Sequence, residues 1–322
     1  MEPYTHKNVC RIPTPTPFPV GAANVYLHKG ERLTLFDAGT KTEAAWGVFS
    51  CRLQELGIEV RDIEQIILTH HHLDHIGLSY RIKQDSDAVI YGHPLVRNEI
   101  PYMFDDSTLR RNAALVLDEL GVPEAVANRV VALRELHREL LDPFVVDKDV
   151  DEQSGTDAFS VHFRAGHSIT DTVYVHKKER WAITGDHLIR NVTPNPLLRR
   201  PDATGKRVKT LVEYCNALQL TREMAIEGCF PGHGTSFRNH REVADATFRH
   251  IERRNNKVLD AMPSKDATPY EITCRLFPKM SEVQLYYGLC ATTGHLELLE
   301  TKGRVDCATD NGVRRYHLCK MQ

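Results

Sequence analysis

The feature that most constrains this chain is a histidine-rich tract at residues 69–75, which reads Thr-His-His-His-Leu-Asp-His. It directly follows the apolar run at 65–68, which predicts a β-strand. The tract therefore lies at the carboxyl end of a strand and in the loop beyond it. In α/β sheets, ligands collect at this end of the strands.

Four residues of the tract are the candidate metal ligands: His70, His72, Asp74 and His75, with His71 and Leu73 between them. Alternation along an extended chain lets His70 and His72 point the same way, while Asp74 and His75 turn toward a second position. Imidazole and carboxylate groups suit zinc. On the tract alone, a surface cluster of histidines is the alternative interpretation.

Three later loops supply further donors: His167, Asp186 and His233. A single histidine in a loop is more often structural than a ligand. Each of these residues, however, follows a strand-like run and has a glycine directly before it, which lets the backbone approach a crowded centre. Together with the histidine tract, they complete two ligand shells.

Composition limits the classes of protein to consider. The 322 residues, 41% of them hydrophobic, suffice for one large core or for a main domain with a small appendage. The formal net charge of −2 offers no global attraction to nucleic acid or to an anionic membrane. The sequence shows no long apolar run and no signal peptide, and its eight cysteines form no CxxC pair. We therefore expect a cytoplasmic protein with free thiols and without membrane association, the alternative being a mature secreted chain whose signal peptide has been removed.

The order of elements predicts an α/β layered core. Strand-like segments lie at residues 23–28, 32–37, 65–68, 88–91, 159–163, 173–176 and 181–184, and a helix is expected at 43–56. Residues 95–141 have long helical patterns and are interpreted as a helical insertion.

The C-terminal residues, 241–322, are expected to form a small module. Thr268 begins a capping box with a proline at the first helical position, and Ser281 begins a second helix in the same way. Residues 304–318 read as a hairpin with an Asn311-Gly312 turn. Helices followed by a hairpin indicate a winged-helix-like module.

Five separated motifs, in order along residues 20–240, resemble the metallo-beta-lactamase superfamily. They are Phe36–Gly39, Thr69–His75, Gly166–Ser168, Gly185-Asp186 and Gly232–Gly234. The resemblance implies an α/β fold of the four-layer αββα metallo-beta-lactamase sandwich type. It also implies a catalytic domain at 1–240 that contains the helical insertion, followed by the winged-helix-like module at 241–322.

The resemblance also assigns roles to individual residues. It implies a first metal bound by His70, His72 and His167, a second bound by Asp74, His75 and His233, and Asp186 bridging both. Asp74 and Asp186 would be the catalytic residues, and Asp37 would hydrogen-bond the histidine loop. The cofactors would be two zinc ions, with iron or manganese as alternatives. His71 and His187 have no ligand role in the family pattern, and we favour a structural role for them over substrate contact.

The function expected from this resemblance is metal-dependent hydrolysis by a metal-bridging hydroxide. The expected substrate is a small ester, thioester, lactone or related acyl compound. Assembly into a homodimer is a possibility that the sequence leaves open. A nuclease or phosphodiesterase is an alternative, with phosphate contacts from Arg304, Arg314, Arg315 and Lys320, but acidic residues nearly balance these basic ones and disfavour nucleic acid. A mononuclear iron enzyme like the persulfide dioxygenases, and a binding module without catalysis, are two further alternatives.

Overall fold

The structure of the protein is a computed structural model that describes residues 2–156, 158–202, 204 and 206–319. The chain forms two compact units, the first from Met1–Phe104, His137–Pro194 and Ala217–Ala244, and the second from Asp105–Leu136, Asn195–Asn216 and Asp245–Gln322. The predicted division at residue 240 stays a prediction, because compact units are not the same as domains that fold alone. Among the described residues, no helix is long and apolar enough to span a membrane.

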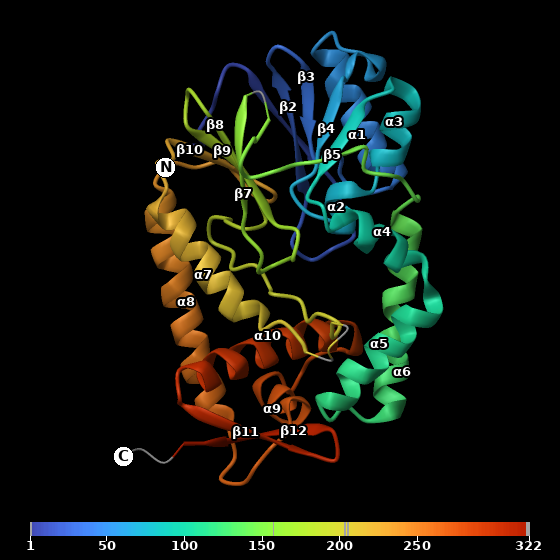
Figure 1. Ribbon diagram of the computed structural model, residues 1–322. Helices are drawn as coiled ribbons and strands as arrows, with labels where there is room; N and C mark the ends of the chain where they lie inside the picture. Colours follow the sequence, from blue (N-terminus) through green and yellow to red (C-terminus); the bar gives the residue numbers. More distant parts are fainter. Residues whose placement is uncertain (1, 157, 203, 205, 320–322) are drawn as a thin grey trace. The chain divides into compact units, whose positions relative to one another are not determined.

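The first unit contains a six-stranded sheet with the order β1-β2-β3-β4-β5-β6. Strands β2 to β5 of this sheet are labelled in Figure 1. Its strands are β1 (Val9–Thr14), β2 (Ala23–Lys29), β3 (Leu33–Phe36), β4 (Gln65–Ile67), β5 (Val89–Gly92) and β6 (Lys148–Asp149). The strands predicted from residues 23 to 91 are confirmed. Strands β3 and β4 are parallel, so their carboxyl ends meet at the same edge of the sheet.

Strand β1 was not predicted, because its segment is rich in proline. Pro13 lies within β1 and is opposite Asn24 of β2. Since β1 is at the edge of the sheet, the missing N–H of a proline can be tolerated there.

A second sheet in the same unit has the order β10-β9-β8-β7. Its strands are β7 (Phe159–Phe163), β8 (Thr172–His176), β9 (Trp181–Gly185) and β10 (Gly228–Pro231). The loop between β7 and β8 carries His167. Strands β9 and β10 are parallel, so the segments that follow them, with Asp186 and His233, leave the sheet on the same side.

The two sheets share an apolar interior. Aromatic and aliphatic side chains from both sheets form one buried cluster, which includes Tyr26, Phe36, Ile67, Tyr174, Trp181 and Phe230. Fully burying a large apolar side chain contributes about 1.5–3 kcal/mol, so this cluster holds the sheets together. A second cluster joins the first sheet to helices α1 (Glu43–Glu55) and α3 (Ser79–Ser86), through Phe49 and Ile82 among others.

The predicted insertion is helical. It contains α4 (Val96–Phe104), α5 (Asp106–Glu119), α6 (Glu124–Leu136) and the short 3-10 helix η2 (His137–Leu140). Within the second unit, Leu117 and Leu120 of the α5 region and Val130 of α6 share a buried cluster with Leu285 and Leu289 of α10 (Glu282–Thr301). Helices α5 and α6 therefore belong to the core of the second unit.

The second unit contains the helices and the hairpin that were predicted for residues 241–322, whereas their interpretation as a winged-helix-like module stays a prediction. It includes most of α8 (His240–Ala261), then α9 (Pro269–Leu276), α10 and the hairpin of β11 (Val305–Asp310) and β12 (Val313–Leu318). The predicted capping box at Thr268 is present. Asn311 and Gly312 have positive φ values of 49° and 84°, as a tight hairpin turn requires. All eight cysteines are free thiols.

Candidate metal centre

The ends of four strands bring the predicted ligands together in the first unit. The histidine tract leaves β4 in extended form, and a short helix, α2 (Leu73–Ile76), begins directly after it. His72 is the N-cap of α2, so the chain changes from extended to helical geometry within the motif. This change explains how Asp74 and His75 reach a position different from that of His70 and His72.

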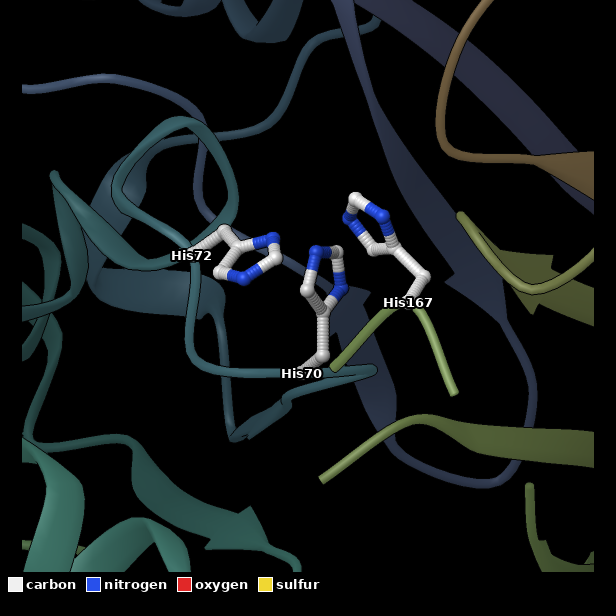
Figure 2. A group of neighbouring side chains, drawn as sticks. All are labelled: His70, His72 and His167. Carbon is white, nitrogen blue, oxygen red and sulfur yellow. The ribbon is translucent and has the colours of Figure 1, made fainter. Parts of the chain in front are cut away.

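The first cluster contains His70, His72 and His167. Their ligand atoms lie within 4.8 Å of one another. Figure 2 shows the three imidazole rings gathered at one point, two from the tract and one from the β7–β8 loop. The ring centroids of His70 and His72 are 4.6 Å apart, and those of His72 and His167 are 4.5 Å apart.

The second cluster contains Asp74, His75 and His233, whose ligand atoms also lie within 4.8 Å of one another. Asp74 Oδ2 is 3.3 Å from His233 Nε2 and 3.8 Å from His75 Nε2. All three residues are buried, with exposed fractions of 8% or less.

Asp186 lies beside both clusters. Its Oδ2 is 3.5 Å from His167 Nε2 and 3.4 Å from His233 Nε2, and its Oδ1 is 3.6 Å from His75 Nε2. The glycine before His233 makes this approach sterically feasible: a Cβ atom on Gly232 would overlap Asp186 Oδ1 and lie 2.8 Å from His75 Cε1. Only glycine fits at this position without displacing the carboxylate.

Asp37 orients the histidine tract, as predicted. Its Oδ1 accepts a hydrogen bond from the Thr69 backbone N–H at 2.7 Å. Its Oδ2 accepts from the Thr69 hydroxyl and from His75 Nδ1, both at 2.8 Å. Because His75 donates from Nδ1, its Nε2 keeps a lone pair that can bind a metal.

In two further histidines, hydrogen bonds within the protein also fix which ring nitrogen is the donor. Since the Thr69 hydroxyl donates to Asp37, its oxygen can accept from His70 Nδ1 at 3.0 Å. His233 Nδ1 is 2.9 Å from the backbone oxygen of Ala22, to which it donates. In both residues Nε2 is the ring nitrogen left to bind a metal ion.

The atoms that remain to bind a metal have the property expected of ligand atoms in a metal site. The Nε2 atoms of His70, His75 and His233 and Oδ1 of Asp186 are buried without a hydrogen-bond partner among the residues that the structure describes. Buried polar atoms without partners are costly, and a cation in contact with them removes that cost. The donor set, with nitrogen and carboxylate oxygen, fits zinc.

The electrostatics of the cluster favour a cation. Burial lowers the pKa of His75, but Asp74, Asp186 and Asp37 together raise it to about 9. Burial likewise lowers the pKa of His233, and Asp186 and Asp74 raise it to about 11. The carboxylates thus attract positive charge strongly enough to hold protons on two imidazoles, and a metal ion would compete for the same positions.

The sequence-based reasoning did not identify several supporting residues. Thr69 connects Asp37 to His70, and the side chain of Asn24 donates to the backbone oxygens of Pro231 and Gly234 on either side of the His233 loop. The buried carboxylate of Asp171 accepts from the Ser168 backbone N–H at 2.7 Å and so shapes the loop of His167. Thr69 and Asp171 are close in sequence to proposed ligands, and this proximity was the one sequence feature that could have identified them as supporting residues.

His71 and His187 are buried and bonded within the protein. His71 Nδ1 is 2.8 Å from Thr170 Oγ1 and 2.9 Å from Ser168 Oγ. His187 Nε2 is 2.8 Å from Thr221 Oγ1. These contacts fit the structural role that we favoured for both.

Comparisons with known proteins agree with this geometry. The model of the metallo-beta-lactamase superfamily matches residues 18–253. The chain is 32% identical over 307 residues to the probable metallo-hydrolase YqjP of Bacillus subtilis (strain 168), an alignment that covers 92% of this chain and 94% of that protein.

Two crystal structures share the fold over nearly the whole chain. One is the metallo-beta-lactamase family protein TTHA1429 from Thermus thermophilus, with a TM-score of 0.82, 23% identity and coverage of 97% of this chain and 99% of that one. The other is a beta-lactamase domain protein from Burkholderia ambifaria, with a TM-score of 0.78, 20% identity and coverage of 98% and 93%. They confirm the predicted fold class. With the family match and the assembled motifs, this chain belongs to the metallo-beta-lactamase superfamily and is a metallohydrolase.

Proposed function

We propose that this metallohydrolase holds two zinc ions and hydrolyses a small ester, thioester, lactone or related acyl compound. The observation that carries the proposal is the position of Asp186. Its carboxylate lies within 3.6 Å of imidazoles from both clusters, so one side chain can serve two ions.

The proposed ligands follow the two clusters. His70, His72 and His167 would hold one ion, and Asp74, His75 and His233 the other, with Asp186 shared. Iron and manganese remain alternatives, because both accept imidazole and carboxylate ligands. When bound, two divalent ions lower the pKa of a water molecule toward neutrality and polarise the substrate oxygen.

Asp74 and Asp186 would orient the attacking water. Burial raises the pKa of Asp186, but His233 and His75 more than offset this effect and hold it below its ordinary value. The pKa of Asp74 is also lowered, because His75 and His233 outweigh burial. Both are therefore ionised near neutral pH, and their oxygens can accept hydrogen bonds from the attacking water.

We propose a direct reaction without a covalent intermediate. The water oxygen bonds to the acyl carbon, the bond to the leaving oxygen or sulfur breaks, and Asp74 passes a water proton to the leaving group. Ser168 is close to the ligands in sequence, but it is 3% exposed and its hydroxyl contacts His71. Its role is to hold the loop rather than to attack the substrate.

A small molecule fits the proposal better than nucleic acid. Arg314, one of the basic residues considered for phosphate contact, forms ion pairs with Glu297 at 2.9 Å and Glu300 at 3.4 Å. Its positive charge is therefore already balanced by these glutamates within the second unit. Lys320 lies outside the described residues.

The test is a hydrolysis assay with the full chain after zinc reconstitution. Thioesters, lactones and phosphodiesters are offered in parallel, with and without a chelator. We expect zinc-dependent turnover of an acyl compound and a loss of at least about 100-fold in Asp186→Asn. The matched control is Asp85→Asn, at an exposed position on α3, which should keep full activity. Acyl turnover that survives in Asp186→Asn, or turnover of phosphodiesters alone, would contradict the proposal.

A further inference from the structure

The second unit contains a cavity of about 120 Å³ that has no part in the metal centre. Its lining comes from α8, from the end of α9 and from α10. The lining residues are Arg254, Lys257, Val258, Leu276, Phe277, Ala291, Thr292 and His295. Half of them are apolar and half carry a polar group, so the lining offers hydrogen-bonding and charged groups to a small ligand.

The cavity has an excess of positive charge. Arg254 is half-buried, and burial lowers the pKa of its guanidinium. It forms no ion pair among the residues that the structure describes, and Lys257 lies one helical turn further along α8. The nearby acid Glu252 is paired with Lys302 at 2.8 Å. Arg254 thus has a charge, reduced solvation and no counter-ion in the described part of the chain.

His295 offers an acceptor to the same cavity. Asn255 Nδ2 donates to Glu252 Oε2 at 3.2 Å, which leaves Asn255 Oδ1 to accept from His295 Nδ1 at 2.7 Å. Burial and the charge of Arg254 lower the pKa of His295 to about 3, so the ring is neutral. With the proton on Nδ1, Nε2 keeps a lone pair.

Thr292 supplies an unused hydroxyl. The residue is 1% exposed, and its Oγ1 has no hydrogen-bond partner among the protein groups that the structure describes. Leaving a buried hydroxyl without a partner is unfavourable, and a bound ligand that accepts a hydrogen bond from it would remove that cost.

We propose that this cavity binds hydrogen phosphate. The two cations balance the negative charge, the Thr292 hydroxyl donates to a phosphate oxygen, and His295 Nε2 accepts from the P–OH group. The volume equals that of roughly four water molecules, which suits one tetrahedral oxyanion. This site does not depend on the proposed hydrolase function.

The acceptor on His295 gives the site a distinctive selectivity. Sulfate has the same shape and charge as hydrogen phosphate but carries no proton near neutral pH, so its oxygen would face the lone pair of Nε2. A phosphate monoester is mostly deprotonated above its second pKa of about 6 and meets the same repulsion. Hydrogen phosphate should therefore bind more tightly than either.

The test is titration calorimetry of the zinc-loaded full chain with inorganic phosphate, sulfate and methyl phosphate at constant ionic strength and about pH 7.5, above that second pKa. We expect saturable phosphate binding that weakens about tenfold or more in Arg254→Gln, because a charged hydrogen-bonding partner is lost. Arg253→Gln is the matched control: this neighbouring arginine is exposed and does not line the cavity. Phosphate binding that is unchanged in Arg254→Gln belongs elsewhere and overturns the proposal, as does equal affinity for sulfate or methyl phosphate.

Thr292→Val separates binding from folding. Valine has nearly the same shape and removes the buried hydroxyl, so the phosphate-free protein should unfold at the same temperature or higher. Its phosphate affinity should nevertheless fall about tenfold, as expected for the loss of one hydrogen bond. A variant that keeps wild-type phosphate affinity, or loses both affinity and thermal stability, would contradict the assignment.

Discussion

The two units each bury a cluster of charged side chains, but the clusters are built differently. In the second unit, Arg207 and Glu297 are 4% and 1% exposed and lie 2.7 Å apart. Arg314 and Glu119 extend this pair, at 2.9 Å from Glu297 and 3.3 Å from Arg207. In this cluster, arginines and glutamates of opposite charge thus form ion pairs with one another inside the protein.

In the metal centre, the carboxylates do not face permanently charged side chains. Asp74 and Asp186 face histidines, and those histidines are cationic only when protonated. The Nε2 atoms of His75 and His233 also lack hydrogen-bond partners in the described protein. Buried charge therefore does not by itself indicate function; carboxylates beside buried imidazole nitrogens that lack other hydrogen-bond partners indicate a place for positive charge, either protons or metal ions.

The largest expected effect is the loss of metal in Asp186→Asn. This change removes the negative charge that lies beside both clusters, so the affinity for zinc should fall by more than the roughly 10–100-fold loss caused by outer-sphere changes. Titration with zinc against a competing chelator measures it. If the variant binds two ions with wild-type affinity, the shared role of Asp186 is wrong.

The matching change in the second unit is Glu297→Gln. It leaves Arg207 buried beside a neutral side chain, and we expect a loss of stability on the order of 3 kcal/mol. Denaturant unfolding measures the loss, while the zinc content should stay unchanged. As a control, Glu252→Gln removes an exposed partner of Lys302 and should cost less than about 1 kcal/mol. A large loss of zinc in Glu297→Gln would break the contrast between the clusters.

A smaller effect on metal affinity is expected for Asp37→Asn. The side chain contacts Thr69 and His75 but lies outside the two ligand clusters, so zinc affinity should fall by about 10–100-fold. The control is again Asp85→Asn. An affinity equal to that of the Asp186→Asn variant would mean that Asp37 does more than orient the histidine loop.

The raised pKa values of His75 and His233, about 9 and about 11, predict release of two protons per chain when metal enters at about pH 7.5. Apparent zinc affinity should therefore rise with pH up to these values. In the metal-free protein the same shifts stabilise the fold below the ordinary histidine pKa of about 6.5, and this contribution is lost as the pH rises through about 9 and 11. Calorimetry in buffers with different ionisation enthalpies counts the protons; a count of zero would contradict the electrostatic account.

The smallest effect is expected for Thr268→Ala in the capping box of α9. The hydroxyl accepts from the Glu271 backbone N–H at 3.2 Å, and its loss should cost about 1 kcal/mol. Denaturant unfolding measures the change, and Thr301→Ala, at the end of α10, serves as a comparison in a helix C-terminal turn. A cost near that of Glu297→Gln would mean that capping, rather than ion pairing, dominates the stability of the second unit.

Much of the fold was predictable because its signals are local. Strands β2 to β5 and β7 to β9, the Thr268 capping box and the Asn311-Gly312 turn depend on residues that are adjacent in sequence. The packing of α5 and α6 with Leu285 and Leu289 was not predictable, because the partners are more than 140 residues apart. A sequence pattern shows that a helix has an apolar face, but not which face it meets.

The metal centre shows the same limit. The seven proposed ligands could be predicted to cluster because their residue types and flanking glycines are visible along the chain. The residues that orient them were mostly missed, since Asn24 and the backbone oxygen of Ala22 act across more than 200 residues. The helical turn of α2 was also missed, because four residues give no periodicity to detect.

The central claim is that the first unit holds two metal ions on the clusters joined by Asp186. Elemental analysis of the protein as purified, without added metal, tests this most directly. We expect about two zinc ions, or similar divalent ions, per chain. One iron ion per chain would favour the mononuclear oxidoreductase alternative, and a protein that neither contains metal nor takes it up when offered would contradict the claim.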